Sequence, residues 1–267
     1  MSRRHADEIL ISDKSNTVLS DAELLRYDRQ IAIKSVDIEG QEKLKSAKVL
    51  ILGVGGLGCA ASQYLAVAGI GHLTLIDFDL VSESNLQRQV LHDDSNIDVL
   101  KVTSAKQALE KLNPYIQIST LATKLSDEDM VELVADYDLV IDCTDNVLVR
   151  EQVNQACFIH KTPLVSAAAI RMEGMVTVFD YQKNMPCYRC FSQLFGEQEL
   201  SCVESGILAP VVGIIGSMQA LEAIKLLLHI GHSLTGRLLF FDAMTMECRE
   251  MKLLKQSSCR VCGDGVI

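Results

Sequence analysis

The feature that most constrains the fold is a glycine-rich segment that directly follows a short apolar run. Residues 48–52 (KVLIL) are apolar after the first position, which predicts a buried strand leading into the pattern G-x-G-x-x-G. A run of small residues then predicts a helix, and residues 73–76 predict a second strand that ends at Asp77. These segments together predict a βαβ unit, in which two parallel strands are joined by a helix.

The glycines of this pattern are Gly53, Gly55 and Gly58. They allow a tight turn and the close approach of a phosphate or ribose to backbone N–H groups at a helix N-terminus. Asp77 lies 24 residues after Gly53, where a carboxylate can accept hydrogen bonds from ribose hydroxyls. The segment therefore predicts a nucleotide site and leaves open whether the nucleotide is NAD or ATP. The alternative is a glycine turn that only packs the helix on the strand.

The alternation of strands and helices continues along the chain. Ser20 begins a capping-box pattern, which predicts a helix that carries Leu24, Leu25, Tyr27 and Ile31. We therefore expect an α/β fold with a Rossmann-like, doubly wound, mostly parallel sheet that antiparallel strands extend in the C-terminal half. Helices are predicted at about 99–112, 126–135, 147–160 and 207–230, and strands at 116–121, 139–142, 163–169, 175–179, 238–241 and 247–253.

The chain length, 267 residues with 48% apolar, fits one large α/β domain or two small ones. Residues 1–19 are mostly polar and aperiodic, and we expect them to form a mobile N-terminal extension. We expect residues 20–267 to form a single domain, in which residues 20–180 are the nucleotide-binding half. Residues 182–206 form a connection too long to be ordinary, which predicts a functional loop.

Charge and hydropathy exclude several classes of protein. The net charge of −10 makes nucleic acid a poor partner, because phosphate backbones require a basic face. No signal peptide is visible, and the longest uncharged run, residues 207–221, has 15 residues where a membrane span needs about 20. The nine cysteines then predict reduced thiols or metal ligands. We expect a cytoplasmic protein that binds neither nucleic acid nor a membrane.

Polar residues after the second strand favour ATP over NAD. Arg88 and Asn85 follow Asp77, Lys101 opens the next predicted helix, and Arg29 lies on the first one. Three cations and an amide suit a triphosphate, which carries more charge than a dinucleotide pyrophosphate. Taken singly, each cation could equally be a solvated surface charge.

A second polar segment, residues 142–146 (DCTDN), follows the fourth predicted strand. Ligands bind at the carboxyl ends of strands in such sheets, and Asp145 there can hold Mg²⁺ against nucleotide phosphates. Asp145 could also be the N-cap of the helix that follows, and the two roles are compatible.

With these residues in view, the chain from about Ser20 to Cys262 resembles the ThiF/MoeB/ubiquitin-activating superfamily. The resemblance implies a homodimer that uses ATP and Mg²⁺ to adenylate the C-terminal glycine of a ubiquitin-like sulfur carrier ending in Gly-Gly, with release of pyrophosphate. The implied carrier is MoaD-like, the small subunit of molybdopterin synthase, and the implied pathway is molybdenum cofactor biosynthesis. The stretches that carry the resemblance include LLRYDRQI, VLILGVGGLGCAASQYLA, SNLQRQ, DLVIDCTDN, PCYRC, CVESG and CRVCG.

The resemblance also implies roles for particular residues. Arg29 would reach the phosphates of the ATP in the partner subunit, while Asn85, Arg88 and Lys101 would supply positive charge and donors and Asp145 would hold the metal. Residues 181–267 would contain the crossover loop, the buried helix, the zinc knuckle and the carrier-binding part. The implied nucleotide site comprises Gly56, Asp77, Ser84, Asn85, Leu86, Gln87, Arg88, Lys101, Asp145 and Asn146.

Four cysteines form two C-x-x-C pairs, at 187–190 and 259–262. Four thiolates can make a closed tetrahedral zinc site, which is structural because no coordination position stays open. Cys187, Cys190, Cys259 and Cys262 are therefore predicted zinc ligands, with four unligated thiols as the alternative.

The other cysteines differ in context. Cys202 lies in the long loop, where some members of the superfamily use a cysteine for covalent bonds to their carrier, so it is a candidate for thiol chemistry. The five residues printed after Cys262 are too few for a sulfur-supplying domain, and we therefore expect an external sulfur donor. Cys59, Cys143, Cys157 and Cys248 lie in apolar contexts and are expected to pack as small hydrophobic residues.

Three other functions compete with the one that the resemblance implies. A ThiF-like enzyme would activate the sulfur carrier of the thiamine pathway. An NAD-dependent oxidoreductase would use the same glycine pattern for a dinucleotide. A carrier-binding module without activity would keep the fold but lose the nucleotide residues. The cations that suit a triphosphate argue against the second, and the presence of every expected ATP residue argues against the third.

Overall fold

The computed structural model describes residues 18–193 and 206–265. Its helices are α1 (Asp21–Arg26), α2 (Asp28–Ile31), α3 (Asp37–Ser46), α4 (Gly56–Ala68), α5 (Lys101–Leu112), α6 (Asp127–Val134), α7 (Val147–His160), α8 (Tyr188–Ser192) and α10 (Ala209–Leu228), with 3-10 turns η1 (Glu83–Asn85) and η2 (Asp94–Asn96). Its strands are β1 (Lys48–Leu52), β2 (His72–Ile76), β3 (Gln117–Leu121), β4 (Leu139–Asp142), β5 (Leu164–Ile170), β6 (Glu173–Phe179), β7 (Arg237–Asp242) and β8 (Glu247–Lys252).

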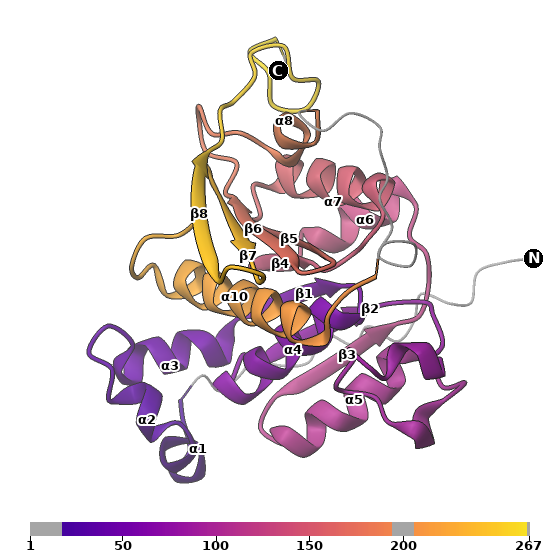
Figure 1. The fold of residues 1–267 in the computed structure, drawn as a ribbon. Helices are drawn as coiled ribbons and strands as arrows, with labels where there is room; N and C mark the ends of the chain where they lie inside the picture. Colours follow the sequence, from indigo (N-terminus) through magenta and orange to yellow (C-terminus); the bar gives the residue numbers. More distant parts are fainter. Residues whose placement is uncertain (1–17, 194–205, 266–267) are drawn as a thin grey trace, which may run out of the picture.

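The strands form one eight-stranded sheet in the order β3-β2-β1-β4-β5-β6-β7-β8 (Figure 1). The first five strands in this order pair in parallel, and β6, β7 and β8 are added antiparallel to their neighbours. Strand order reverses between β1 and β4, and such a switch point opens a crevice at the carboxyl ends of the strands. The predicted fold class is confirmed.

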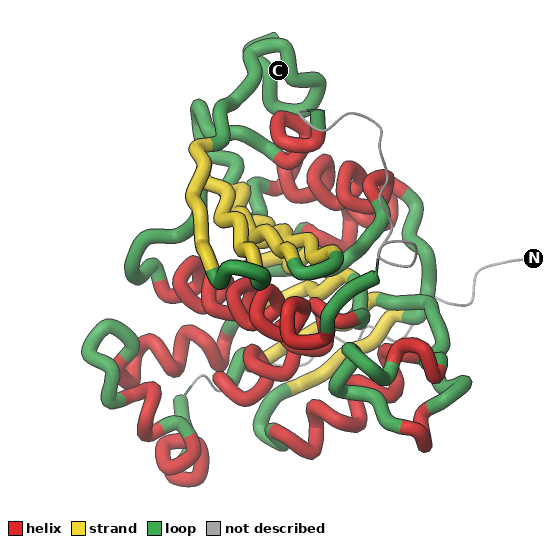
Figure 2. Tube along the Cα trace, in the orientation of Figure 1, coloured by secondary structure: helices red, strands yellow, loops and turns green. Residues whose placement is uncertain are grey.

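Alternate residues of the central strands face two hydrophobic layers. Val49 and Ile51 of β1 belong to the layer that includes α4, α5 and α10, whereas Leu50 and Leu52 belong to the layer with α6, α7 and α8. The two central strands β1 and β4 are apolar except at one end, Lys48 and Asp142, which is typical of parallel strands that are covered on both faces. In Figure 2, α10 passes in front of the strands, with the opposite layer behind them.

Small residues bring α4 and α10 close together. A Cβ on Gly56 would lie 2.9 Å from Val212, and a Cβ on Gly216 would lie 2.5 Å from the carbonyl oxygen of Leu57. Any larger side chain at either glycine would push the helices apart. The start of α4, and therefore the glycine segment before it, is held by α10.

Several local predictions were wrong. The first predicted helix is interrupted at Tyr27, whose buried hydroxyl accepts a hydrogen bond from Asn113, so α1 and α2 are separate. Helix α3 was not predicted, because it has little amphipathic pattern. Part of the predicted long loop is helix α8. Cys248 is exposed on edge strand β8, so it does not pack as a small hydrophobic residue.

Helix α10 is the predicted apolar helix near residues 207–230. By length and hydropathy alone it could cross a membrane, and half of its most apolar 18-residue window is buried inside the protein. It packs against α4 and against β5 and β6. This burial is typical of the core helix of a globular fold.

Candidate nucleotide-binding site

The glycine segment between β1 and α4 lies tightly against the end of β4. Gly53 has φ +87°, and a Cβ there would lie 2.9 Å from the carbonyl oxygen of Cys143. A Cβ on Gly58 would lie 1.9 Å from the carbonyl oxygen of Gly53. Both positions therefore require glycine, because a side chain at either would collide with backbone atoms. Gly55 is the N-cap of α4 and makes no side-chain cap bond.

Asp77 holds this turn from the end of β2. Its Oδ2 accepts a hydrogen bond from the N–H of Val54 at 2.8 Å, and its Oδ1 accepts one from the N–H of Asp79 at 2.9 Å. A carboxylate has about four acceptor positions, so two remain for a ligand hydroxyl. The structure thus brings Asp77 and the glycine segment together, as the sequence predicts.

The polar segment after β2 folds on itself in η1. Asn85 accepts a hydrogen bond from the N–H of Ser82 at 3.2 Å, and Arg88 donates one to the carbonyl of Ser84 at 2.9 Å. Leu86 is half-buried, whereas Gln87 is exposed. These bonds fix the backbone of residues 84–88 while the guanidinium of Arg88 keeps further donors for a ligand.

Lys101, the first residue of α5, connects to the same edge. Its side chain is only 9% exposed, and its ammonium lies 2.8 Å from Oδ2 of Asp79. Asp79 in turn donates its N–H to Asp77. Lys101 is therefore held in a defined place beside the carboxyl end of β2.

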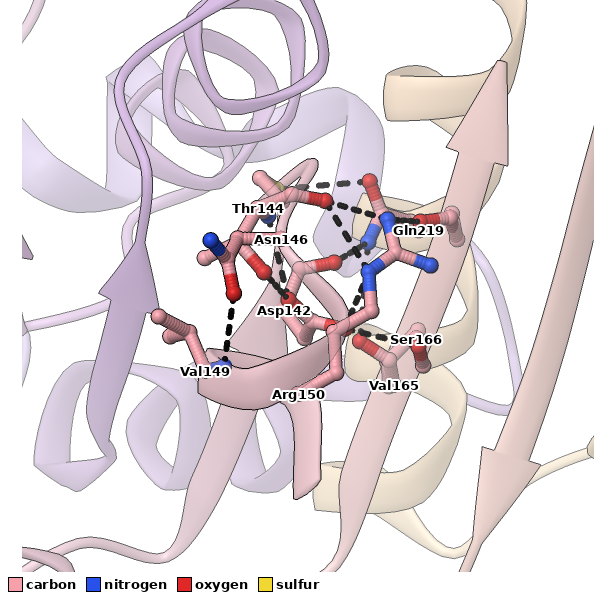
Figure 3. Close-up of polar contacts among 10 residues, drawn as sticks. Asp142, Thr144, Asn146, Val149, Arg150, Val165, Ser166 and Gln219 are labelled. Atoms are coloured by element: carbon pink, nitrogen blue, oxygen red, sulfur yellow. Dashed lines mark hydrogen bonds and ion pairs between the residues drawn. The ribbon is translucent and has the colours of Figure 1, made fainter. Parts of the chain in front are cut away.

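A buried network orders the segment after β4 (Figure 3). Asp142, which is 1% exposed, accepts hydrogen bonds from the N–H and the hydroxyl of Thr144 at 3.0 and 2.7 Å. Its other oxygen accepts a hydrogen bond from the hydroxyl of Ser166 at 2.8 Å. Buried carboxylate oxygens need such donors, because a buried polar atom without a hydrogen-bond partner is unfavourable.

Arg150 and Gln219 complete this network, and the sequence analysis missed both. Arg150 donates to the carbonyls of Thr144 and Ala167 and lies 3.7 Å from Asp142. Although burial lowers the pKa of Arg150, the charge of Asp142 raises it overall, so the guanidinium stays charged. Gln219 of α10 donates to the carbonyl of Asp142 at 2.8 Å. In the sequence, Gln219 could have been recognised as a polar residue within the long apolar run at 207–221.

Asp145 and Asn146 project from this ordered segment. Asp145 is exposed. Asn146, not Asp145, is the N-cap of α7, because its Oδ1 accepts a hydrogen bond from the N–H of Val149 at 3.1 Å. The alternative role of Asp145 as a helix cap is therefore wrong. An exposed carboxylate at the carboxyl end of β4 suits Mg²⁺, which favours one or two carboxylates together with phosphate oxygens.

Arg29 is not brought to this edge within one chain. Its side chain is 94% exposed on α2. The neighbouring Gln30 donates a 2.9 Å hydrogen bond to the carbonyl of Ala68, the last residue of α4. The glycine segment lies at the other end of α4, about 18 Å away at 1.5 Å per residue.

A buried thiol and a buried imidazole both contact the carbonyl of Val54 in the glycine segment. His92 lies 2.8 Å from the hydroxyl of Ser104 on α5, and its other nitrogen lies 3.4 Å from the carbonyl of Val54. The thiol of Cys59 also contacts that carbonyl. Burial lowers the pKa of His92 and raises the pKa of Cys59 to about 12, so both groups are neutral at pH 7.

The predicted zinc ligands lie together near the C-terminus. The sulfur atoms of Cys187, Cys190, Cys259 and Cys262 all lie within 4.8 Å of one another, and all four residues are buried. The pairs 187–259 and 190–262 are 3.7 and 3.4 Å apart. Tetrahedral zinc with Zn–S of about 2.3 Å requires sulfur atoms about 3.8 Å apart, so the cluster is compatible with zinc.

The sulfur of Cys190 accepts hydrogen bonds inside the cysteine cluster. The hydrogen bond with the thiol of Cys187 lowers the pKa of Cys190 and raises that of Cys187. The backbone N–H of Gln256 also donates to the sulfur of Cys190 at 3.4 Å. The cluster joins α8 to the segment after β8, as Figure 1 shows by the position of the C-terminus beside α8.

Two of the sequence predictions fall outside the described residues. Cys202 lies in the segment 194–205, and most of the predicted N-terminal extension lies in residues 1–17. Cys59, Cys143 and Cys157 are buried, as predicted for small packing residues.

Comparison with known proteins identifies the class of protein that this fold and site define. Residues 27–261 match the ThiF family, and the chain belongs to it.

More particular similarities follow within that family. The chain is 58% identical to the molybdopterin-synthase adenylyltransferase of Escherichia coli (strain K12), over 92% of this chain and 98% of the relative. It is 60% identical to the protein of the same name from Haemophilus influenzae, over 88% and 97%. It is also 43% identical to an adenylyltransferase and sulfurtransferase of Culex quinquefasciatus, of which it covers only 57%.

A solved structure agrees with the fold. The crystal structure of E. coli MccB with ATP superposes with a TM-score of 0.76 at 25% identity, covering 90% of this chain and 75% of that one.

Proposed function

We propose that this protein adenylates the C-terminal glycine carboxylate of a ubiquitin-like sulfur carrier, using ATP and releasing pyrophosphate. The carrier would be MoaD-like, the small subunit of molybdopterin synthase, and the pathway molybdenum cofactor biosynthesis. Relatives named molybdopterin-synthase adenylyltransferase, aligned over nearly their whole length, support this proposal. We expect the reaction to take place in the cytoplasm.

The observation that carries the proposal is the convergence of three segments at one edge of the sheet. The glycine segment after β1, the pair Asp77 and Asp79 with Lys101 after β2, and the segment 142–146 after β4 all follow carboxyl ends of neighbouring parallel strands. In this proposal ATP lies across the glycines with its ribose on Asp77. Its phosphates accept hydrogen bonds from Asn85, Arg88 and Lys101. Asp145, together with Asn146, would hold the Mg²⁺ ion next to the phosphates. The remaining proposed contacts come from Gly53, Gly55, Gly56, Gly58, Ser84, Leu86 and Gln87.

The chemistry fits these residues. The carrier carboxylate attacks the α-phosphorus, the bond to the β-phosphate oxygen breaks, and pyrophosphate leaves. Two anions must be brought together, so the protein contributes mainly positioning and neutralisation of the developing negative charge. Mg²⁺, when bound, adds charge neutralisation on the phosphates. No nucleophilic side chain is needed, and the buried thiols of Cys59 and Cys143 are neutral because burial raises their pKa.

A homodimer completes the proposed site. Arg29 lies at the far end of α4 from the glycine segment, so it would serve the site of a partner subunit. The cysteine cluster would hold one Zn²⁺ and act structurally. Sulfur would come from an external donor rather than from Cys202.

The proposal is tested by ATP–pyrophosphate exchange with purified carriers. Exchange should require a carrier ending in Gly-Gly and should vanish when that carrier lacks its last glycine. A molybdopterin-pathway carrier should support faster exchange than a thiamine-pathway carrier. Faster exchange with the thiamine carrier would reassign the substrate, while NADH oxidation without any exchange would refute adenylation.

The role of the sulfur donor has its own test. Enzyme, ATP and carrier incubated with sulfide should give thiocarboxylated carrier even in the variant Cys202→Ala. A variant that makes the adenylate normally but gives no thiocarboxylate would make Cys202 an obligatory sulfur relay.

A further inference from the structure

One buried polar side chain lies beside the glycine segment and belongs to none of the groups described above. Gln89 follows Arg88 and is only 3% exposed. Its Oε1 has no hydrogen-bond partner, and among the residues that the structure describes it is the one buried side-chain oxygen or nitrogen in that condition. A buried polar atom without a partner is unfavourable, so its presence requires a reason.

The amide nitrogen of Gln89 faces the start of α4. Nε2 lies 3.7 Å from the position that a Cβ on Gly55 would occupy, and apart from Gly55 and its two chain neighbours no other residue has a heavy atom within 4 Å of that position. Gly55 is the N-cap of the 13-residue helix α4 and makes no side-chain cap bond. The first turn of a helix leaves backbone N–H groups without intrahelical partners. Donors from two separate elements therefore lie close to Gly55.

Packing alone does not account for a glutamine at this position. Leucine or methionine would fill a similar volume without burying an unpaired oxygen. The terminal torsion of a glutamine is broad, so the carboxamide can turn to present either atom to an occupant. An anion seated on Gly55 would give the nitrogen an acceptor, and water bound to that anion would give the oxygen a donor.

We propose that Gln89 is a phosphate-binding residue of the ATP site, donating from its amide to a triphosphate oxygen that lies over Gly55. This inference rests on the proposed function, since it takes ATP as the occupant. It adds a neutral donor to the cations of Arg88 and Lys101. It also explains why the Cβ position of Gly55 must stay open, because any side chain there would stand between the amide and the phosphate.

The test compares Gln89→Leu with the control Gln107→Leu, an exposed glutamine on α5. Calorimetry on the full-length protein measures the dissociation constants of ATP and of adenosine, which has the same base and ribose but no phosphate. In Gln89→Leu the dissociation constant should rise about tenfold for ATP, which corresponds to a loss of about 1.4 kcal/mol in binding free energy. The dissociation constant of adenosine should rise less than twofold, because adenosine has no phosphate. Without ligand, its melting temperature should equal or exceed that of the wild type, because the unpaired oxygen is gone.

Two results would overturn the inference. One is ATP binding by Gln89→Leu within twofold of the wild type, and the other is an equal loss for ATP and adenosine, which indicates a structural role. The variant Gln89→Glu gives an independent check, because a carboxylate facing a phosphate should weaken ATP binding more than leucine does. If the wild type binds ATP but exchanges pyrophosphate with no carrier, the proposed function fails while the Gln89 comparison still stands. If the wild type binds no ATP, both fail.

Discussion

The side chain of Gln30 donates a hydrogen bond to the carbonyl oxygen of Ala68, the last residue of α4. Because this carbonyl is at the end of the helix, it has no partner within α4. This contact places the neighbouring Arg29 at the opposite end of α4 from the glycine segment, with its guanidinium in solvent. An arginine there can serve a nucleotide only if the nucleotide belongs to another copy of the chain.

Mixed dimers test this arrangement. Arg29→Ala and Lys101→Ala should each be inactive alone, because each removes a cation from every site. A mixed dimer contains one site with both cations, so an equal mixture should recover about a quarter of wild-type exchange by random pairing of subunits. The unmixed variants at the same total concentration are the control. No recovery, in samples where mass spectrometry detects the mixed dimer, would contradict a role across the interface.

Removing the carboxylate of Asp145 should abolish adenylation without disturbing the fold. Asp145 is exposed, and the segment that carries it is held by Asp142 and Arg150 rather than by its own side chain. Loss of a metal ligand should lower exchange at least about 100-fold in Asp145→Ala, or about 2.7 kcal/mol. The matched control is Asp127→Asn at the exposed start of α6. Near-normal exchange by a folded Asp145→Ala protein would remove Asp145 from the site.

The cysteine cluster should hold about one zinc per chain. Cys190→Ser and Cys262→Ser should lose that zinc and lower the melting temperature, while the exchange rate per folded molecule changes little. Structural zinc contributes about 10–16 kcal/mol in small zinc peptides, and a chain with its own large core should depend on it less. Cys248→Ser, at an exposed position on β8, should change neither property. Purified wild-type protein that is fully stable without zinc would contradict this role.

Stability should fall below neutral pH in part because of His92. Burial lowers the pKa of His92 below its usual value of 6.5, so the folded state keeps the imidazole neutral when the unfolded chain binds a proton. The contribution of His92 is therefore complete above pH 6.5 and decreases as the pH falls below it, by no more than about 1.4 kcal/mol per pH unit. Urea unfolding at pH 7.5 and 5.5 should show a smaller difference for His92→Gln than for the wild type. His160→Gln, at an exposed end of α7, is the control and should show the same difference as the wild type. An unchanged difference in His92→Gln would mean that folding does not lower the pKa of His92.

The sequence predicts best where a local pattern determines the structure. The run at 48–52, the glycines and Asp77 lie in consecutive elements of one βαβ unit, and their predicted contact is present. Each C-x-x-C pair is also a local pattern, and the structure brings the two pairs together although they lie 72 positions apart along the chain.

What the sequence did not predict depends on partners that are distant along the chain. Tyr27 interrupts the first helix because its hydroxyl reaches Asn113, which no local periodicity indicates. The carbonyl of Asp142 accepts a hydrogen bond from Gln219 of α10, which lies 77 positions away and is brought close only by the tertiary fold. No sequence pattern indicates a role for Gln89, because its unpaired oxygen results from burial in the fold and not from residue spacing.

The close packing of Gly56 on Val212 also has a consequence for how the chain folds. Val212 lies 156 positions after Gly56, so the face of α4 that α10 covers stays open during synthesis until the last quarter of the chain has emerged. Joining such distant segments carries a large loop-closure entropy, and contacts of this separation slow folding. A fragment that ends at residue 180 would display a stripe of small and apolar side chains along α4 to the solvent. Such a fragment should aggregate on the ribosome or bind a chaperone. It should not fold by itself into a stable nucleotide-binding unit before α10 is synthesised.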